Sequence, residues 1–277
     1  MRTTYLYLNG EIIPAEQAAI SPYDIGLLRG YAVFDLLRTV NGQPFLLAEH
    51  LKRLRESASH LGLSVPVTDG EIEAVVLELL ERNGHDEATV RLVLTGGVSP
   101  DGMAFDPSTP TFFILTQDIH LPPDSLYSHG GKLLSHQHRR EVPQAKTTNY
   151  LTMVQHRPLA EKAGAMDLLY HDGEHVFEAA SASVYFVRGT TILAPRDSVL
   201  WGTIGSFVLD LARERYDVLF TDITLAEAFS ADEVFLTSTT RAVVPITAID
   251  DTVIGDGTPG PVTRDLMAAY QRSVFGE

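Results

Sequence analysis

Apolar residues recur along the chain at two spacings, one typical of strands and one typical of amphipathic helices. Asn-Gly pairs at 9–10 and 41–42 separate short apolar runs, which predicts two tight turns between strands. Leucines three and four positions apart, as at Leu47, Leu51 and Leu54, predict helices. The expected strands are residues 4–8, 11–13, 30–40, 43–47, 89–95, 111–117, 132–135, 176–178, 184–187, 217–221 and 233–236, and the expected helices are residues 48–61, 68–81, 149–163, 204–215, 225–230 and 260–275.

The order of these elements predicts two domains of α+β type. A proline-containing stretch, Leu121-Pro122-Pro123-Asp124-Ser125, interrupts the pattern and is typical of a linker. We therefore expect an N-terminal domain over residues 1–120, a linker at 121–128 and a C-terminal domain over 129–277.

The charge balance and the missing residue types exclude several classes of protein. The chain has 21 basic and 36 acidic residues and a formal net charge of −15, which argues against nucleic acid or an anionic membrane as partner. It has no cysteine, so disulfides and thiolate sites are excluded. No apolar run reaches the roughly 20 residues of a spanning helix, and the first residues form no signal core. We therefore expect a cytoplasmic protein without a membrane partner.

Sequence motifs for common cofactors and metals are absent. The chain contains no G-x-G-x-x-G, G-x-x-x-x-G-K-[ST], G-x-S-x-G or H-E-x-x-H pattern. His136 and His138 would share one face of a strand, but no carboxylate pair lies near them in sequence, which favours a solvated strand face over a metal site. We therefore expect no metal ion.

Lysine is scarce in this chain, which directs attention to the setting of each one. Only Lys52, Lys132, Lys146 and Lys162 occur among the 21 basic residues. Lys146 stands among small and neutral polar residues, and a desolvated lysine can form a Schiff base with an aldehyde. The same spacing also fits a surface lysine in a loop before a helix, so the residues alone leave both interpretations open.

Four further segments could bind a flat, phosphorylated ligand. Glu178 ends a strand and precedes five small residues, so its carboxylate could approach a protonated pyridine nitrogen. Residues 201–206 lead into a helix whose first amides would attract a phosphate, residues 237–240 offer four hydroxyl groups, and Arg53 could add positive charge. Taken singly, the same features also fit a strand-end acid, a helix cap, a strand end and a solvated arginine.

Taken together and in order, these segments resemble the class IV aminotransferases, which have fold type IV and use pyridoxal 5′-phosphate. The matching segments, which run over nearly the whole chain, are residues 49–54, 146–150, Glu178, 202–204 and 238–240. The resemblance implies that Lys146 is the Schiff-base lysine and that Glu178 pairs with the pyridine nitrogen. It further implies cofactor contacts for Arg53, Tyr150, Ser181, Thr203, Ile204, Ser238, Thr239 and Thr240.

Within this set, the resemblance implies that the phosphate is bound by Arg53, by the amides of Thr203 and Ile204, and by Thr239. Tyr150 would lie near the phenolic oxygen of the cofactor.

Three positions depart from the family pattern. Ser183 stands where the family commonly has Asn, and residues 203–205 replace a usual Ile-Thr-Arg. Arg241-Ala242 follow the phosphate threonine, where an acid is usual. Because backbone contacts do not depend on side chains, these departures bear on the subgroup rather than on the cofactor.

The arginines suggest which subgroup the chain resembles. Arg29 takes the place of a tyrosine in some branched-chain enzymes, and Arg91 lies in a strand of apolar neighbours. A buried guanidinium needs an anion, so both could bind substrate carboxylates, with Phe34 beside them. This pattern resembles the D-amino-acid transaminases, with 2-oxoglutarate or pyruvate as amino acceptor. Pairing of both arginines with nearby acidic residues is the alternative.

The resemblance leaves other activities open. Within the family these are a branched-chain L-amino-acid aminotransferase and an aminodeoxychorismate lyase, and outside it a protein that binds pyridoxal phosphate without catalysis. Family members are usually homodimers, so we expect a homodimer with amino acids and 2-oxo acids as partners. Enantiomer, side-chain preference and preferred acceptor do not follow from the sequence.

Overall fold

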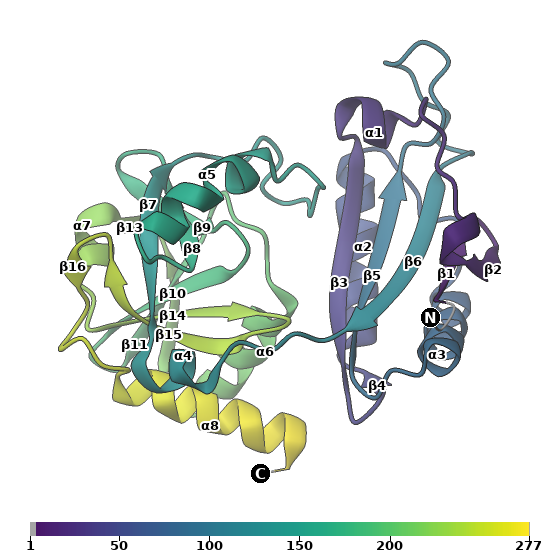
Figure 1. Cartoon of the computed structure of the whole chain (residues 1–277). Helices are drawn as coiled ribbons and strands as arrows, with labels where there is room; N and C mark the ends of the chain where they lie inside the picture. The colour runs from purple at the N-terminus through teal and green to yellow at the C-terminus, as the bar shows by residue number, and fades with distance from the viewer. Residues whose placement is uncertain (1–3, 277) are drawn as a thin grey trace. The chain divides into compact units, whose positions relative to one another are not determined.

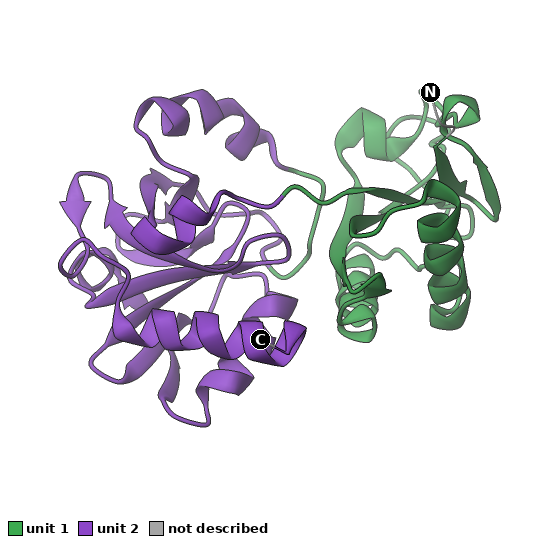
Figure 2. Ribbon diagram, turned by 60° about the horizontal axis from the view of Figure 1, so that its bottom comes forward, with its two compact units in different colours: residues 1–120, 144–149 green, residues 121–143, 150–277 purple. Residues whose placement is uncertain are grey.

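The computed structural model describes residues 4–276, and the chain divides into two compact units. The first unit comprises Met1–His120 and Gln144–Asn149, and the second comprises Leu121–Pro143 and Tyr150–Glu277 (Figure 2). The chain therefore leaves the first unit, starts the second, and returns briefly before the second is completed. The return segment lies inside the stretch that was expected to belong to the C-terminal domain.

The first unit is an antiparallel sheet with two helices on one face (Figure 1). Its strands are β1 (Tyr5–Leu8), β2 (Glu11–Pro14), β3 (Ala32–Val40), β4 (Gln43–Pro44), β5 (Ala88–Thr95) and β6 (Thr111–Asp118), and its helices are η1 (Ala15–Gln17), α1 (Ile25–Arg29), α2 (Leu47–His60) and α3 (Asp69–Asn83). The strand order is β2-β1-β6-β5-β3-β4. Leu51 and Leu54 of α2 and Ile72 of α3 form the core with apolar side chains of the sheet.

Successive side chains along a strand of this sheet point to opposite faces, one packed against the helices and one turned away from them. On β3, Val33 and Leu37 belong to the core under the helices, so Asp35 between them also faces α2. Phe34 therefore points to the opposite face. Because Phe34 pairs with Val93 and Leu36 pairs with Arg91, the Arg91 side chain shares that face with Phe34.

The second unit is a ten-stranded mixed sheet that curls on itself. Its strands are β7 (Gly131–Gln137), β8 (Asp167–His171), β9 (His175–Ala179), β10 (Ser183–Arg188), β11 (Thr191–Pro195), β12 (Asp217–Thr221), β13 (Ile223–Thr224), β14 (Glu233–Ser238), β15 (Ala242–Ile249) and β16 (Thr252–Val253). The order is β12-β11-β10-β14-β15-β7-β8-β9-β13, with β16 on β15. Although β9 and β10 stand far apart in this order, they contact each other and are joined by a tight turn at 179–182.

Five helices complete the second unit: α4 (Asp124–His129), α5 (Leu151–Lys162), α6 (Thr203–Ala212), α7 (Leu225–Phe229) and α8 (Pro261–Phe275). Helix α8, drawn in yellow in Figure 1, packs along β15 and β14, and α6 packs against β14 and α8. The predicted linker at 121–128 is therefore not irregular throughout, because α4 begins within it.

The structure confirms most of the elements that were expected from the sequence. The turns at Asn9-Gly10 and Asn41-Gly42, the helix over 48–61 and the helix over 260–275 lie where predicted, within two residues. The elements that are not among the expected ones are η1, α1, α4, β8, β11, β13, β15 and β16. Over residues 4–276 no helix has the length and apolar character needed to cross a membrane, and no group of acidic and histidine side chains could hold a metal ion.

Candidate active site

The return segment places Lys146 on the edge of the first sheet. The backbone carbonyl of Lys146 accepts a hydrogen bond from Phe34 N at 2.9 Å, and Thr148 N donates to Ala32 O at 3.0 Å. The amide of Lys146 donates to Ser57 Oγ of α2 at 3.0 Å. Backbone bonds to β3 and to a helix therefore hold this lysine, which is half-buried.

The three other lysines have ordinary surface settings. Lys52 lies 4.0 Å from Glu56 on the exposed side of α2, and Lys132 lies 3.3 Å from Asp251. Lys162, at the end of α5, is exposed. Among the four, Lys146 alone contacts an aromatic ring through its ammonium group, as far as residues 4–276 are concerned.

Phe34 brings Lys146 and Arg91 to the same ring. Lys146 Nζ lies 4.7 Å from the ring centroid of Phe34, and Arg91 Cζ lies 5.1 Å from it. Cations over an aromatic face are attracted by its quadrupole. Within the described part of the chain no carboxylate pairs with Arg91, so its charge is not neutralised by an acidic partner. In the sheet, Arg91 pairs with Leu36 on one side and with Leu115 on the other.

Arg29 differs from Arg91 in its surroundings. It ends α1 as an exposed residue, where Nη1 donates to the carbonyl of Leu28 at 2.8 Å and Nε lies 3.3 Å from the sulfur of Met103. The expectation of a buried guanidinium is therefore wrong for Arg29, because α1 projects its last turn away from the core. In the described residues neither arginine pairs with an acid, which removes the internal ion-pair alternative.

Arg53 is held by a buried carboxylate. Its Nε and Nη2 donate to the two oxygens of Asp35, each at 2.8 Å, and His50 Nδ1 lies 2.7 Å from Asp35 Oδ1. Burial alone would raise the pKa of Asp35, but Arg53 and then His50 hold it well below its ordinary value. Burial lowers the pKa of His50. Asp35 is therefore a carboxylate that fixes the direction of the Arg53 side chain.

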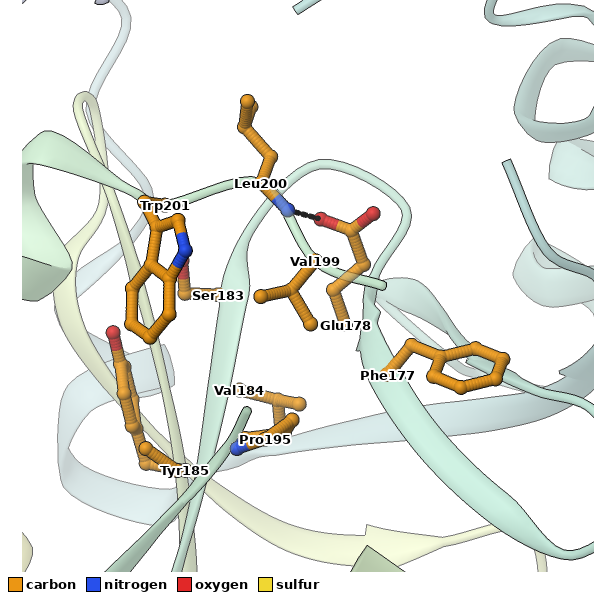
Figure 3. Close-up of a pocket in the computed structure, with 10 residues that line it drawn as sticks. Phe177, Glu178, Ser183, Val184, Tyr185, Pro195, Val199, Leu200 and Trp201 are labelled. Atoms are coloured by element: carbon orange, nitrogen blue, oxygen red, sulfur yellow. Dashed lines mark hydrogen bonds between the residues drawn. The ribbon is translucent and has the colours of Figure 1, made fainter. Parts of the chain in front are cut away.

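In the second unit, Glu178 lies at the end of β9 and is only 4% exposed. Its Oε1 lies 3.1 Å from Arg140 Nε, and its Oε2 accepts a hydrogen bond from Leu200 N at 3.2 Å (Figure 3). Arg140 also donates to the carbonyl of Ala180 at 3.1 Å and lies over the ring of Tyr150, 5.6 Å from its centroid. Arg140 was not predicted from the sequence, because nothing local marks one arginine in a polar stretch as the partner of a distant acid.

A pocket opens beside Glu178, between the end of β9, the start of β10, the end of β11 and residues 199–201. It encloses about 260 Å³, including the part open to solvent, and Trp201 and Tyr185 form one wall while Val199 and Phe177 lie on the side of Glu178 (Figure 3). Burial raises the pKa of Tyr185 to about 12, so its hydroxyl stays protonated. The pocket therefore offers one carboxylate among aromatic and apolar side chains.

The amino-terminal end of α6 packs closely against β10 and β14. A Cβ atom at Gly205 would lie 2.2 Å from the hydroxyl of Tyr185, which leaves no room for a side chain there. A Cβ atom at Gly202 would lie 2.5 Å from Ser183 Oγ, so the Ser183 side chain would have to turn away. Gly202 provides no side-chain cap for the helix, although the first amides of a helix need acceptors. Thr203 and Ile204 are buried here, so their backbone amides rather than their side chains suit an anion.

The hydroxyl-bearing segment forms the hairpin loop between β14 and β15. Ser238 pairs with Ala242 across this loop, and Thr237 pairs with Ser183 at the start of β10. The loop, the end of β9 and the start of α6 therefore meet at one end of the second sheet. Ser181, in the β9–β10 turn, donates from Oγ to Asp167 Oδ2 at 2.5 Å and accepts from Arg241 Nη2 at 2.8 Å, so this hydroxyl already has two protein partners.

Comparison with known proteins decides the family. The family model "Amino-transferase class IV" matches residues 32–249 of the chain. The chain is a class IV aminotransferase. It is 34% identical over 278 residues to a Methanocaldococcus jannaschii protein assigned as a branched-chain-amino-acid aminotransferase, covering 96% of this chain and 95% of the relative. It is 30% identical over 276 residues to the D-alanine aminotransferase of Staphylococcus haemolyticus, covering 98% of each.

Solved structures agree with this assignment and with fold type IV. The branched-chain aminotransferase of the archaeon Thermoproteus uzoniensis, solved with norvaline, superposes with a TM-score of 0.87 at 26% identity, covering 99% of this chain and 95% of the other. A branched-chain amino acid aminotransferase of T.th., solved with pyridoxamine 5′-phosphate, gives a TM-score of 0.88 at 28% identity, covering 100% of this chain and 95% of the other. The cofactor of this class IV aminotransferase is pyridoxal 5′-phosphate, and the uncapped start of α6 and the buried Glu178 fit a phosphorylated pyridine.

Lys146 should be the residue that binds the cofactor covalently. Lys146→Ala should abolish transamination, whereas Lys132→Ala, which removes a surface ion pair, should keep the wild-type rate. Borohydride reduction of the loaded enzyme, followed by peptide mapping, should place the cofactor on the peptide that contains Lys146. A label on Lys52, Lys132 or Lys162 would contradict the assignment.

Glu178→Gln should slow the proton-transfer half-reaction by about 100-fold or more, because it removes the negative charge of the buried carboxylate that lines the pocket. Cofactor binding should weaken far less, since the amide nearly keeps the shape. Stopped-flow absorbance with a single amino acid measures the half-reaction. Glu174→Gln, an exposed change in the same hairpin, is the matched control, and equal rates for the two variants would make Glu178 a packing residue.

Proposed function

We propose that this enzyme transfers an amino group between an amino acid and a 2-oxo acid, and that Arg91 binds a substrate carboxylate. The observation that carries the proposal is the position of Arg91 on the ring of Phe34, which also lies against the ammonium group of Lys146. Arg91 pairs with no acidic residue among residues 4–276, and in a protein with a net charge of −15 it supplies the local positive potential that an anionic substrate needs. Its planar fork matches a carboxylate with two hydrogen bonds.

Each remaining site residue has a role that its contacts support. Lys146 Nζ carries the proton that is removed from and returned to the reacting carbon atoms, as general base and then acid. Glu178, held by Arg140, keeps the pyridine nitrogen protonated. Bound pyridoxal phosphate supplies an electron sink for carbanion charge at the substrate.

A second group of residues holds the phosphate in this proposal. It combines Arg53, directed by Asp35, with the amides of Thr203 and Ile204 and with the hydroxyls of the β14–β15 loop, Ser238, Thr239 and Thr240. Tyr150 lies with its ring against Arg140, which supports a place near the ring substituents of the cofactor. Ser181 acts through Asp167 and Arg241, to which its hydroxyl is bonded.

For the amino donor we propose D-amino acids, with 2-oxoglutarate or pyruvate as acceptor. The relative at 30% identity, a D-alanine aminotransferase, supports this choice. A branched-chain L-amino-acid donor is the second candidate. The exposed position of Arg29 favours it, because only one of the two arginines expected for a carboxylate clamp lies in apolar surroundings, and so does the relative at 34% identity.

Assembly and location also stay predictions. We expect a homodimer, and exposed apolar side chains on α1 and on the loop after β5, such as Leu27 and Met103, offer a surface for a second copy. We expect the enzyme to act in the cytoplasm.

A half-reaction screen should separate the donor classes. Each D- and L-amino acid is mixed with the loaded enzyme in the absence of acceptor, and conversion of the cofactor is followed by absorbance. We expect D-alanine or D-glutamate to convert the cofactor fastest. Faster conversion by L-leucine, L-isoleucine or L-valine would overturn the D-specific proposal and establish the branched-chain alternative.

Arg91→Leu should raise the KM for amino acids and 2-oxo acids by about 10- to 100-fold, because a charge-assisted hydrogen bond contributes about 1.5–3 kcal/mol. The cofactor spectrum and the rate with 1-phenylethylamine, which has no carboxylate, should stay unchanged. Arg29→Leu is the companion variant, and its exposed position predicts a smaller effect, confined to dicarboxylic substrates. Equal losses with 1-phenylethylamine and with amino acids would show that Arg91 supports the fold instead.

A further inference from the structure

Arg241 makes a dense set of side-chain contacts in the hairpin loop between β14 and β15. Its Nε donates to Ser238 Oγ at 2.9 Å, and Nη1 and Nη2 lie 3.2 Å and 3.3 Å from Asp167 Oδ2. Nη2 also donates to Ser181 Oγ at 2.8 Å and to Ser181 O at 3.2 Å. One guanidinium therefore joins the loop that bears the hydroxyl groups to the turn that follows Glu178.

The acid at the centre of this cluster is deeply buried. The side chain of Asp167 is 1% exposed and that of Arg241 is 16% exposed. Asp167 also accepts the Ser181 hydroxyl through Oδ2 and the amide of Leu168 through Oδ1 at 2.9 Å. Because a buried carboxylate without partners is costly, Arg241 and Asp167 depend on each other, and their geometry is well defined.

The backbone of the same loop needs this support. Ala242, directly after Arg241, has φ of +53°, a left-handed conformation that costs an L-residue about 1–2 kcal/mol. The carbonyl of Arg241 accepts a hydrogen bond from the Tyr127 hydroxyl at 3.1 Å. The side-chain and carbonyl contacts of Arg241, directly before the strained residue, therefore help to hold the loop in this conformation.

We infer that Arg241 is a positioning residue for the cofactor phosphate: it fixes the Ser238–Thr240 loop against the Glu178–Ser181 turn, so that the loop hydroxyls and the partner of the pyridine nitrogen keep one spacing. All three of its nitrogens are bonded to protein groups, so it acts through the loop and not by contact with the phosphate. The inference rests on the proposed phosphate role of the loop.

The test compares pyridoxal 5′-phosphate with pyridoxal, which has the same ring and no phosphate. Trp201 is the only tryptophan of the chain and lines the pocket beside Glu178, so quenching of its fluorescence measures the Kd of each compound with cofactor-free full-length protein. Arg241→Met should raise the Kd for pyridoxal 5′-phosphate by about 10-fold or more, the size expected for lost charge-assisted bonds. The Kd for pyridoxal should change less than about two-fold.

Two further variants relate the effect to the cluster. Asp167→Asn, which keeps shape and removes charge, should produce the same phosphate-selective loss, and the double variant should lose no more than the larger single loss, because the residues act as one unit. Arg188→Met, which removes a surface arginine 3.7 Å from Glu227, is the control and should bind both compounds as wild type. If Arg241→Met does not fold, Arg241→Lys, which keeps charge but cannot reach all partners, carries the same prediction.

The binding measurements distinguish a failure of the positioning role of Arg241 from a failure of the proposed phosphate role of the loop. If the wild type binds both compounds equally, the phosphate role of the loop fails. If the wild type prefers pyridoxal 5′-phosphate and Arg241→Met keeps that preference, the loop stands and the positioning role fails. Equal weakening of both compounds by Arg241→Met would show that Arg241 supports only the fold.

Discussion

The backbone pairing of residues 146–148 with β3 is the constraint on which the rest of the site depends. Two hydrogen bonds, Phe34 N to Lys146 O and Thr148 N to Ala32 O, attach a segment that enters from the second unit to the edge of the first sheet. The same strand carries Phe34 toward the ammonium group and Asp35 toward Arg53. One strand, β3, therefore sets the positions of Lys146, of the Phe34 ring and of the Asp35 carboxylate that binds Arg53. A regular strand fixes such positions more precisely than a loop does.

Most of the charged groups around the proposed site belong to acid–arginine pairs. Asp35 with Arg53, Glu178 with Arg140, and Asp167 with Arg241 are each nearly neutral as a pair and fix direction. Arg91 has no such acidic partner among the described residues, and its guanidinium group lies over the ring of Phe34. In this strongly acidic chain, Arg91 is therefore the residue that we propose to attract the substrate carboxylate.

Local signals explain which parts of the fold can be predicted well from the sequence. The Asn-Gly turns, the capping box of Thr68 and Glu71, and the stop at Gly84 lie within a few residues of the element that they define. Helix α1, by contrast, has only five residues and no hydrophobic period, and β15 begins at a left-handed alanine that no propensity favours.

The site was less accessible to sequence reasoning than the fold, for a physical reason. Lys146, Glu178 and residues 202–204 follow a motif order, so the sequence singles them out. It does not single out the partners that orient them: Arg140 lies 38 positions from Glu178 (178 − 140), and Arg241 reaches Asp167 across 74 positions. Such pairs are created by the curl of the second sheet, which no short window reveals. Arg29 was misjudged because its apolar neighbours in sequence are themselves exposed on α1.

The brief return of the chain to its first unit has a consequence for synthesis on the ribosome. When residue 120 has emerged, β3 is still missing the segment that pairs with its first half, so part of its backbone forms an open sheet edge. That edge stays open until residue 149 is made, while the second unit is only begun. A fragment cut at residue 120 would keep this edge permanently and would be prone to pair with copies of itself. The segment that brings the lysine into place thus also closes this edge of the first sheet during synthesis.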